Sequence, residues 1–224
     1  MKLKKTLEKS GIIFRDVMVV VVGIAITFSL NNWMNNKKER KDVQHYLNAL
    51  KMELEENLNN VEDRTRYHKE AMELCEYLNS HKPEAYQRDS IDKYEWIING
   101  TYPFSYKTSA FEMLKMSGAM RLMKDKELLS TIWNTYQQLE FLKTANDSYM
   151  LRKGDEMYLF WQNRDEVMDL FNHNDFTKVF RSPTVKRYFS FLKISTNRAT
   201  YQQFLEGAEQ IRSTIEAIDN QKSF

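Results

Sequence analysis

The sequence VMVVVVGIAITFSL, residues 17–30, runs for fourteen consecutive residues without a charge. Residues 11–30 form a twenty-residue segment, and a helix needs roughly 20 residues to cross about 30 Å of hydrocarbon. The span is long enough if Arg15 and Asp16 lie near one interface, with Arg15 reaching toward the headgroups. Trp33 suits the opposite interface. The sequence therefore predicts a transmembrane helix over residues 11–33. Its predicted anchor residues are Arg15, Val17, Val20, Gly23, Ile26, Leu30 and Trp33.

Three other interpretations compete with a membrane span. A buried core helix is one, but this segment lies at the extreme N-terminus between two lysine-rich stretches, an awkward place for a core. A cleaved signal peptide fits the basic start, with Thr27 and Ser29 as a poor small-x-small site. An interfacial helix is the third alternative. A single-pass anchor remains the favoured interpretation.

The charges beside the segment predict its orientation. Five basic residues precede it within a short tail, residues 1–10 and Arg15, and four follow it between Lys37 and Lys41. Short basic tails stay in the cytoplasm, so we expect a cytoplasmic N-terminus, a position in the inner membrane and a periplasmic or otherwise extracytoplasmic domain. Residues 46–224 carry a small excess of acid, which offers no attraction to a polyanion and indicates no nucleic-acid partner.

Residues 34–80 are predicted to form one long helix that continues from the span. Neither Gly nor Pro occurs between Ile24 and Lys82, so the residues that usually end helices are missing there. Apolar residues recur at steps of three and four from Val43 to Val61, which is typical of an amphipathic helix. Asn57, Arg64 and His68 interrupt this seam, which argues against a strict coiled coil and for packing against neighbouring helices.

Residues 81–224 are predicted to complete an antiparallel helical bundle, so the fold class is all-α. After a loop at residues 81–89, Asp89 is expected to cap a helix over residues 90–99. Residues 101–108, TYPFSYKT, read as an extended aromatic piece. Ser109 and Glu112 then form a capping box that begins the next helix, which ends near Gly118.

Three further helices are predicted in the C-terminal half. Asp125 can cap the first, which continues to about residue 142. The second covers about residues 147–171, with a bend at Gly154, and the cluster NHND at residues 172–175 ends it. Ser182 and Pro183 supply the N-cap and first residue of a last helix that ends near residue 219.

The chain lacks the patterns that usually carry catalysis. No HExxH, CxxC, phosphate-binding or GxSxG motif occurs, and the four histidines have no metal-ligand spacing. The adjacent pairs Glu55-Glu56 and Asp165-Glu166 point about 100° apart on a helix and read as solvated. Cys75 reads as a small buried residue rather than a reactive thiol. We therefore expect no enzyme activity, cofactor or metal, and identify no small-molecule substrate.

Two sets of residues are candidate partner contacts. Tyr102, Phe104 and Tyr106 either clamp a loop over the bundle with their own rings or form an exposed patch for a protein partner. Gly23 and Thr27 lie four residues apart in the span, where small residues let a second helix approach; packing against lipid is the alternative.

Two segments resemble an uncharacterised family of membrane-anchored proteins found mainly in Bacteroidetes. Residues 20–33, VVVGIAITFSLNNW, and NKKER at residues 36–40 are similar to that family's VIGILIAL-x-INNW-NE-x-x-K. Residues 109–118, SAFEMLKMSG, with KDKEL at 124–128, are similar to its TFEELKSSG…IKNKEL. Met34 departs from the usual Asn, and Val17 to Val19 stand where an acidic residue often falls nearby. The resemblance implies a place in the cell envelope and transfers no active site.

The leading hypothesis is a non-enzymatic, membrane-anchored helical scaffold that binds the bilayer and a protein partner or its own copies. A sensory or ligand-binding ectodomain that acts through a separate transducing partner is the alternative, and a pocket between the helices would favour it. An enzyme is the third hypothesis and would need converging polar groups with shifted pKa values in a cleft.

Overall fold

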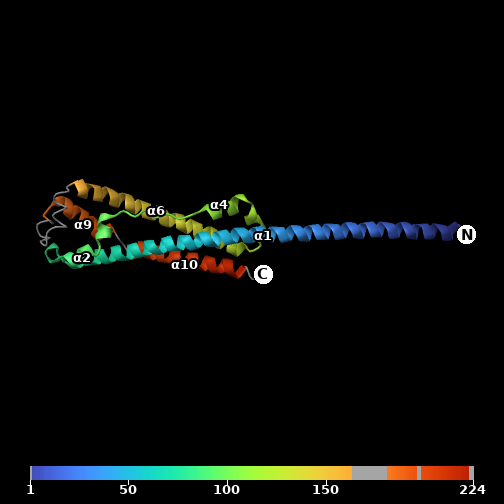
Figure 1. The fold of residues 1–224 in the computed structure, drawn as a ribbon, viewed down its shortest axis with the longest axis horizontal. Helices are drawn as coiled ribbons and strands as arrows, with labels where there is room; N and C mark the ends of the chain where they lie inside the picture. The colour runs from blue at the N-terminus through green and yellow to red at the C-terminus, as the bar shows by residue number, and fades with distance from the viewer. Residues whose placement is uncertain (1, 163–180, 196–197, 222–224) are drawn as a thin grey trace.

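The computed structural model describes residues 2–162, 181–195 and 198–221, with side chains from Met18 onward in the N-terminal helix. Within these ranges the chain is helical, with short connections and no strand. One helix projects far beyond the others, and the remaining helices gather along its second half (Figure 1). The all-α class expected from the sequence is therefore confirmed.

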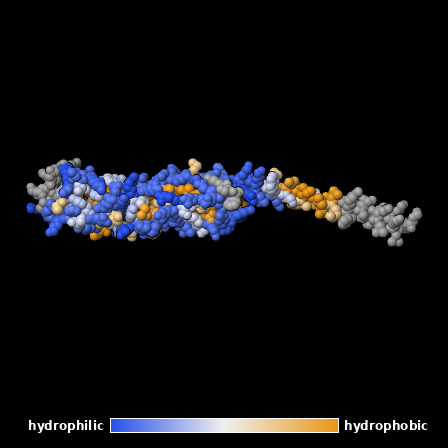
Figure 2. Space-filling view, turned by 90° about the horizontal axis from the view of Figure 1, so that it is seen from below, coloured by the Kyte–Doolittle hydropathy of each residue, from blue (hydrophilic) through white to orange (hydrophobic). Residues whose placement is uncertain are grey.

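Helix α1 (Lys2–Ser80) is a single helix of 79 residues, about 120 Å long at 1.5 Å per residue. It begins at Lys2, so the segment expected as a tail is helical. Side chains from Met18 to Met34 are exposed, and they form the apolar projecting stretch in Figure 2. This helix is long and apolar enough to cross a membrane. None of its apolar window is buried, which contradicts the alternative of a core helix.

Short elements follow α1 at the end of the domain distant from the projecting helix: η1 (Pro83–Ala85), α2 (Arg88–Asp92) and α3 (Glu95–Asn99). The sequence predicted one helix over residues 90–99, capped by Asp89. The structure corrects this, because Asp89 lies inside the first turn of α2 and the helix stops at Asp92. Residues 100–108, which we call the strap, are extended and return toward the projecting helix (Figure 1).

Helix α4 (Ser109–Met116) begins where the sequence predicts, but not by a capping box. Thr108 is the N-cap and makes no side-chain cap bond. The amides of Ala110 and Phe111 instead donate to Glu53 of α1, at 2.7 and 3.3 Å. Gly118 follows α4 with a φ of 73°, in the left-handed region that glycine enters without strain. Helix α5 (Ala119–Leu122) comes next.

Helix α6 (Lys126–Gln162) is continuous, where the sequence predicted two helices and a bend at Gly154. Asp125 caps it as expected, accepting from the amide of Leu128 at 2.8 Å. The predicted last helix is instead two, α9 (Pro183–Ser195) and α10 (Arg198–Gln221). Residues 163–180, including the predicted break at 172–175, lie outside the described residues.

Cross-contacts fix the directions of the three long helices. Glu53 of α1 contacts Tyr136 of α6, and farther along both helices Tyr67 contacts Lys153, so α1 and α6 run in the same direction. Helix α10 runs the opposite way, since its end pairs with Lys51 and its first half lies against His68. The predicted antiparallel arrangement therefore does not hold for α1 and α6. After α1 ends, the strap returns the chain along the domain before α6 begins, so the two helices run in the same direction (Figure 1).

The core consists of two apolar clusters in sequence along α1. The cluster nearer the projecting helix contains Leu47 to Val61 of α1, together with residues of α4, α6 and α10. The distant cluster contains Tyr67 to Leu78 of α1, with residues of α3, α6 and α9. Buried polar side chains occupy the boundary between the two clusters.

Candidate ligand-binding site

Six buried side chains, which we call the polar layer, lie where the two apolar clusters meet, and the two tyrosines among them also belong to the distant cluster. Helix α1 contributes three of them at helical spacing, and α6 contributes three more at steps of three and four. Residues at such spacing share one face of a helix, so two polar stripes face each other inside the domain. The polar layer consists of Arg64, Tyr67, His68, Asn146, Tyr149 and Lys153.

The Arg64 guanidinium lies beneath the strap and is only 8% exposed. Its Nη2 donates to the carbonyl oxygen of Pro103 at 3.0 Å, and the group stacks over the Tyr67 ring at 5.0 Å. The Nε and Nη1 atoms are buried and have no hydrogen-bond partner among the described residues. A buried donor left unpaired costs about 1–3 kcal/mol, so an acceptor that reached these atoms would relieve that cost.

Lys153 is fully buried, yet each hydrogen bond that its ammonium group makes to the described residues goes to a neutral oxygen. It donates to the Tyr67 hydroxyl at 3.1 Å, to the Gly100 carbonyl at 2.5 Å and to the Ile97 carbonyl. The carbonyls are those left open where α3 ends, so Lys153 satisfies a helix C-terminus. Burial, with a smaller effect from Arg64, lowers the pKa of Lys153 to about 7.

His68 and Asn146 complete the polar layer on the side toward α10. The His68 ring is 1% exposed and lies 4.9 Å from the ring of Phe204. Burial and then the charge of Arg64 lower the pKa of His68 to about 3, so its imidazole is neutral near pH 7. The Asn146 amide nitrogen lies 3.5 Å from the carbonyl of Tyr102. Asn146 therefore helps to hold the strap, whereas His68 packs against α10.

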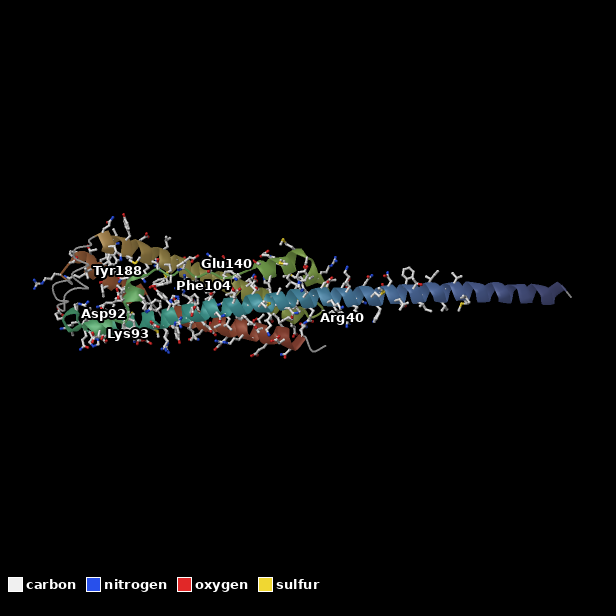
Figure 3. The ribbon with its side chains drawn as sticks, in the orientation of Figure 1. Arg40, Asp92, Lys93, Phe104, Glu140 and Tyr188 are labelled. Carbon is white, nitrogen blue, oxygen red and sulfur yellow. The ribbon has the colours of Figure 1, made fainter. Side chains whose placement is uncertain are left out.

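An open cavity of about 290 Å³ reaches this polar layer from the surface between α1 and the strap. Arg64 and Tyr67 line its inner part. Aromatic walls come from Trp96, Tyr102 and Phe104; the remaining lining residues are Asn60, Asp63, Arg66, Pro103 and Ser105. Phe104 lies between α1 and α6 in Figure 3. The volume is at the small end of the range for ligand pockets.

The charges around the cavity favour an anion. Asp63 at its margin already pairs with Arg66, with 2.8 Å between Oδ1 and Nη2. Arg64 makes no ion pair within the described part of the chain, and the lowered pKa of Arg64 reports its burial. A carboxylate or similar anion would supply the missing acceptor, and charge-assisted hydrogen bonds are the strong ones. The aromatic walls would hold a flat or apolar body.

The structure separates the three aromatic residues that the sequence grouped as candidate partner contacts. Phe104 is 3% exposed and packs edge-on against Phe204 at 5.4 Å, as the clamp interpretation requires. Tyr106 is half-buried and donates to Glu140 at 2.6 Å. Tyr102 is 37% exposed and lines the cavity. Only Tyr102 of the three therefore presents substantial surface to a ligand or partner.

Gly23 and Thr27 lie on the projecting part of α1, remote from the polar layer. The Thr27 hydroxyl donates to the Gly23 carbonyl at 2.8 Å, so its polarity is satisfied within the helix. The two residues border an open groove with Val20, Ile24, Phe28 and Asn31. The predicted anchor residues Val20, Ile26, Leu30 and Trp33 are exposed; the side chains of Arg15 and Val17 lie outside the described set.

The remaining chemical candidates have structural partners. The Cys75 thiol is half-buried and donates to the Lys193 carbonyl at 2.7 Å, and burial raises the pKa of Cys75. Glu56 pairs with Lys107 at 2.6 Å, and Glu55 lies 3.7 Å from Lys51. In the described ranges no three His, Cys, Asp or Glu residues gather as a metal site. Asp165, Glu166 and His173 lie outside those ranges.

The sequence contained a signal for the polar layer that we interpreted differently. Asn57, Arg64 and His68 stand in the core-facing register of α1, and their polarity predicted an interrupted seam. In the structure all three are buried, and Asn57 exchanges two hydrogen bonds with the backbone of Lys107, at 2.7 and 2.9 Å. Polar residues that keep the core register were thus the sign of an internal polar site. Lys153 was missed.

The fold and this site define a helical protein that has, in the part of the chain that the structure describes, one candidate membrane helix and an internal polar site beside an open cavity. Residues 16–158 match the family described as a family of unknown function, DUF6090. Because the match covers more than half of the chain, the protein belongs to that family. No curated protein and no solved structure matches the chain.

Proposed function

We propose that this protein is a membrane-anchored binding protein whose helical domain takes a small carboxylate-bearing molecule in the cavity over Arg64. The single observation that carries the proposal is the Arg64 guanidinium, buried at the inner end of an aromatic cavity with Nε and Nη1 unpaired. This supports the ligand-binding hypothesis over a purely structural scaffold. The proposal is for recognition and not for catalysis.

Two kinds of contact would hold the ligand, one to its anionic group and one to its flat ring. The anionic group accepts from Arg64, whose position is fixed by Pro103 and by stacking on Tyr67. A flat ring fits beside Trp96 and Tyr102, whose own rings lie edge to face at 5.3 Å. Since the strap forms one wall, an occupied cavity would hold the strap more firmly against α1, and this would link binding to a change at the surface.

The experiment titrates full-length protein in detergent with phenylacetate and, as the neutral counterpart, 2-phenylethanol. Binding is followed by quenching of tryptophan fluorescence, with Trp96→Phe identifying the signal that comes from the cavity. We expect phenylacetate to bind and the alcohol to bind at least about tenfold more weakly, because a charged hydrogen bond contributes about 1.5–3 kcal/mol.

Arg64→Gln and Arg66→Gln form the matched pair of variants. Both remove one positive charge beside the same cavity, but Arg66 is exposed and already pairs with Asp63. We expect the Arg64 variant to lose binding and the Arg66 variant to keep it. Equal binding of the acid and the alcohol, equal loss in both variants, or no saturable binding of phenylacetate, indole-3-acetate or succinate would overturn the proposal.

A second candidate function is self-association through the span, and the groove beside Gly23 and Thr27 favours it. Small residues there let a second helix approach closely. Gly23→Leu would fill the groove and should abolish crosslinked dimers in native membranes, whereas Ala25→Leu on another face should not. Crosslinking that is unchanged in Gly23→Leu would exclude this face.

The place and orientation of the protein belong to the same proposal. We propose an inner-membrane position in the cell envelope with a cytoplasmic N-terminus, supported by the charges that flank the span. Labelling of Ser117→Cys, an exposed residue after α4, by a membrane-impermeant maleimide in intact cells tests the side. Labelling only after lysis would reverse the orientation.

A further inference from the structure

The end of the helical domain that faces the projecting helix carries a surface that we call the basic collar. It forms where α1 leaves the other helices, the position of Arg40 in Figure 3. Helix α1 contributes four of its basic side chains, and three more come from a distant part of the sequence: one from α5, one from the turn after it and one from the first residue of α6. The basic collar consists of Lys37, Lys38, Arg40, Lys41, Arg121, Lys124 and Lys126, all exposed.

We propose that the basic collar binds the anionic phospholipid headgroups of the bilayer that α1 crosses, so that the helical domain rests on the membrane surface. This inference depends on the membrane span but not on the ligand site. It adds a second, electrostatic membrane contact to the apolar anchor. Anionic headgroups attract Lys and Arg side chains that lie beside a span within about a Debye length of the membrane surface.

The contacts of the collar leave its charge available. Lys37 lies over the Trp33 ring at 5.2 Å, the ring expected at the interface. No ion pair joins any of the seven cations to an acid in the described part of the chain. Asp125 lies among them but accepts from the Leu128 amide at 2.8 Å and from Gln221 at 2.6 Å.

The reach of the collar agrees with a headgroup contact. Arg40 follows Trp33 by seven residues, about 10 Å along the helix, and the headgroup layer is about 5 to 8 Å thick on each side. Arg40 and Lys124 line the same depression of about 300 Å³, so the two side chains lie at a similar height along α1. Leu122 and Met123 line its apolar part, and Glu39 also borders it. Long cationic side chains can bridge the remaining distance.

The test uses full-length protein in nanodiscs of phosphatidylcholine alone or mixed with phosphatidylglycerol, and measures hydrogen exchange of residues 119–126. Nanodiscs present both leaflets, so the result does not depend on orientation. We expect exchange to slow by about threefold or more with phosphatidylglycerol, and the effect to vanish in high salt, because screening weakens exposed charges.

The variant is Arg121→Gln, Lys124→Gln and Lys126→Gln together, which leaves α1 unchanged. Its control is Lys69→Gln, Lys82→Gln and Lys186→Gln, which removes the same charge from exposed sites away from the collar. We expect the collar variant to lose the response and the control to keep it, with equal melting temperatures. The same exchange rate in both kinds of disc, or an equal loss in both variants, would overturn the proposal.

Discussion

Glu53 of α1 accepts a hydrogen bond from the Tyr136 hydroxyl of α6, with 2.5 Å between the two oxygens. The same carboxyl group accepts from the amides of Ala110 and Phe111, which the first turn of α4 leaves open. One buried side chain therefore joins three helices. The burial of Tyr136 raises the pKa of its phenol, and the hydrogen bond to Glu53 raises this pKa further.

The first prediction sets this contact against the capping box expected from the sequence. Glu53→Leu should lower the free energy of unfolding by on the order of 3 kcal/mol, since it leaves two buried amides and a phenol without an acceptor. Glu112→Ala, which removes any capping box, should change it by less than about 0.5 kcal/mol, since Glu112 pairs at the surface with Lys115. Urea unfolding of the full-length protein measures both, and a larger loss in the Glu112 variant would restore the capping box.

The second prediction concerns His68 and acid. Its pKa is about 3 when folded and 6.5 ordinarily, so the unfolded chain takes up a proton that the folded chain refuses. Stability should therefore fall as the pH is lowered from 6.5 toward about 3. In His68→Phe, which keeps a ring against Phe204, this part of the loss should disappear. Parallel stability curves for the two proteins across that pH window would refute the buried neutral imidazole.

Local information was sufficient to predict α1 from residue 11 onward, because neither Gly nor Pro occurs between Ile24 and Lys82. It also predicted the cap at Asp125, the start of a helix at Pro183 and the stop at Gly118, because each depends on residues within one turn. The extended strap was predicted for the same reason: Pro103 and alternating aromatic residues disfavour a helix.

The polar layer could not be predicted in this way, because each of its contacts joins distant parts of the chain. Arg64 meets Pro103 and Lys153 meets Ile97, and both depend on the path of the strap between α1 and α6. That path also makes α6 parallel to α1, which no helical periodicity can indicate. The prediction of the residue that caps α4 was wrong for the same reason. Glu112, a carboxylate close in sequence, matched the local pattern, whereas Glu53 lies more than 50 residues away.

The third prediction uses Lys153. Its pKa is lowered from 10.5 to about 7, so between these values the unfolded chain holds a proton that the folded chain has released. Stability should therefore rise with pH across this window, relative to Lys153→Met. The variant should also be less stable at the upper end, because the carbonyls of Ile97 and Gly100 lose their donor. A constant difference between the two proteins across the window would show that Lys153 titrates normally.

The last prediction compares two glycines inside helices that differ in the space around them. A Cβ at Gly154 of α6 would meet nothing within 4 Å, and the helix is not bent there into a separate element. Gly154→Ala should therefore stabilise the protein by about 0.5–1 kcal/mol, the usual gain at an open helical site.

A Cβ at Gly207 of α10 would lie 2.6 Å from Cδ1 of Leu142, which is fully buried and must repack. Gly207→Ala should cost about 1–3 kcal/mol, because overpacking outweighs the gain in helix propensity. Thermal unfolding followed by circular dichroism measures both variants, and if the two side chains compete for one space, Leu142→Ala should cost less in the Gly207→Ala background than in the wild type. Stabilisation by both substitutions would mean that α6 and α10 do not approach each other as closely as the structure shows.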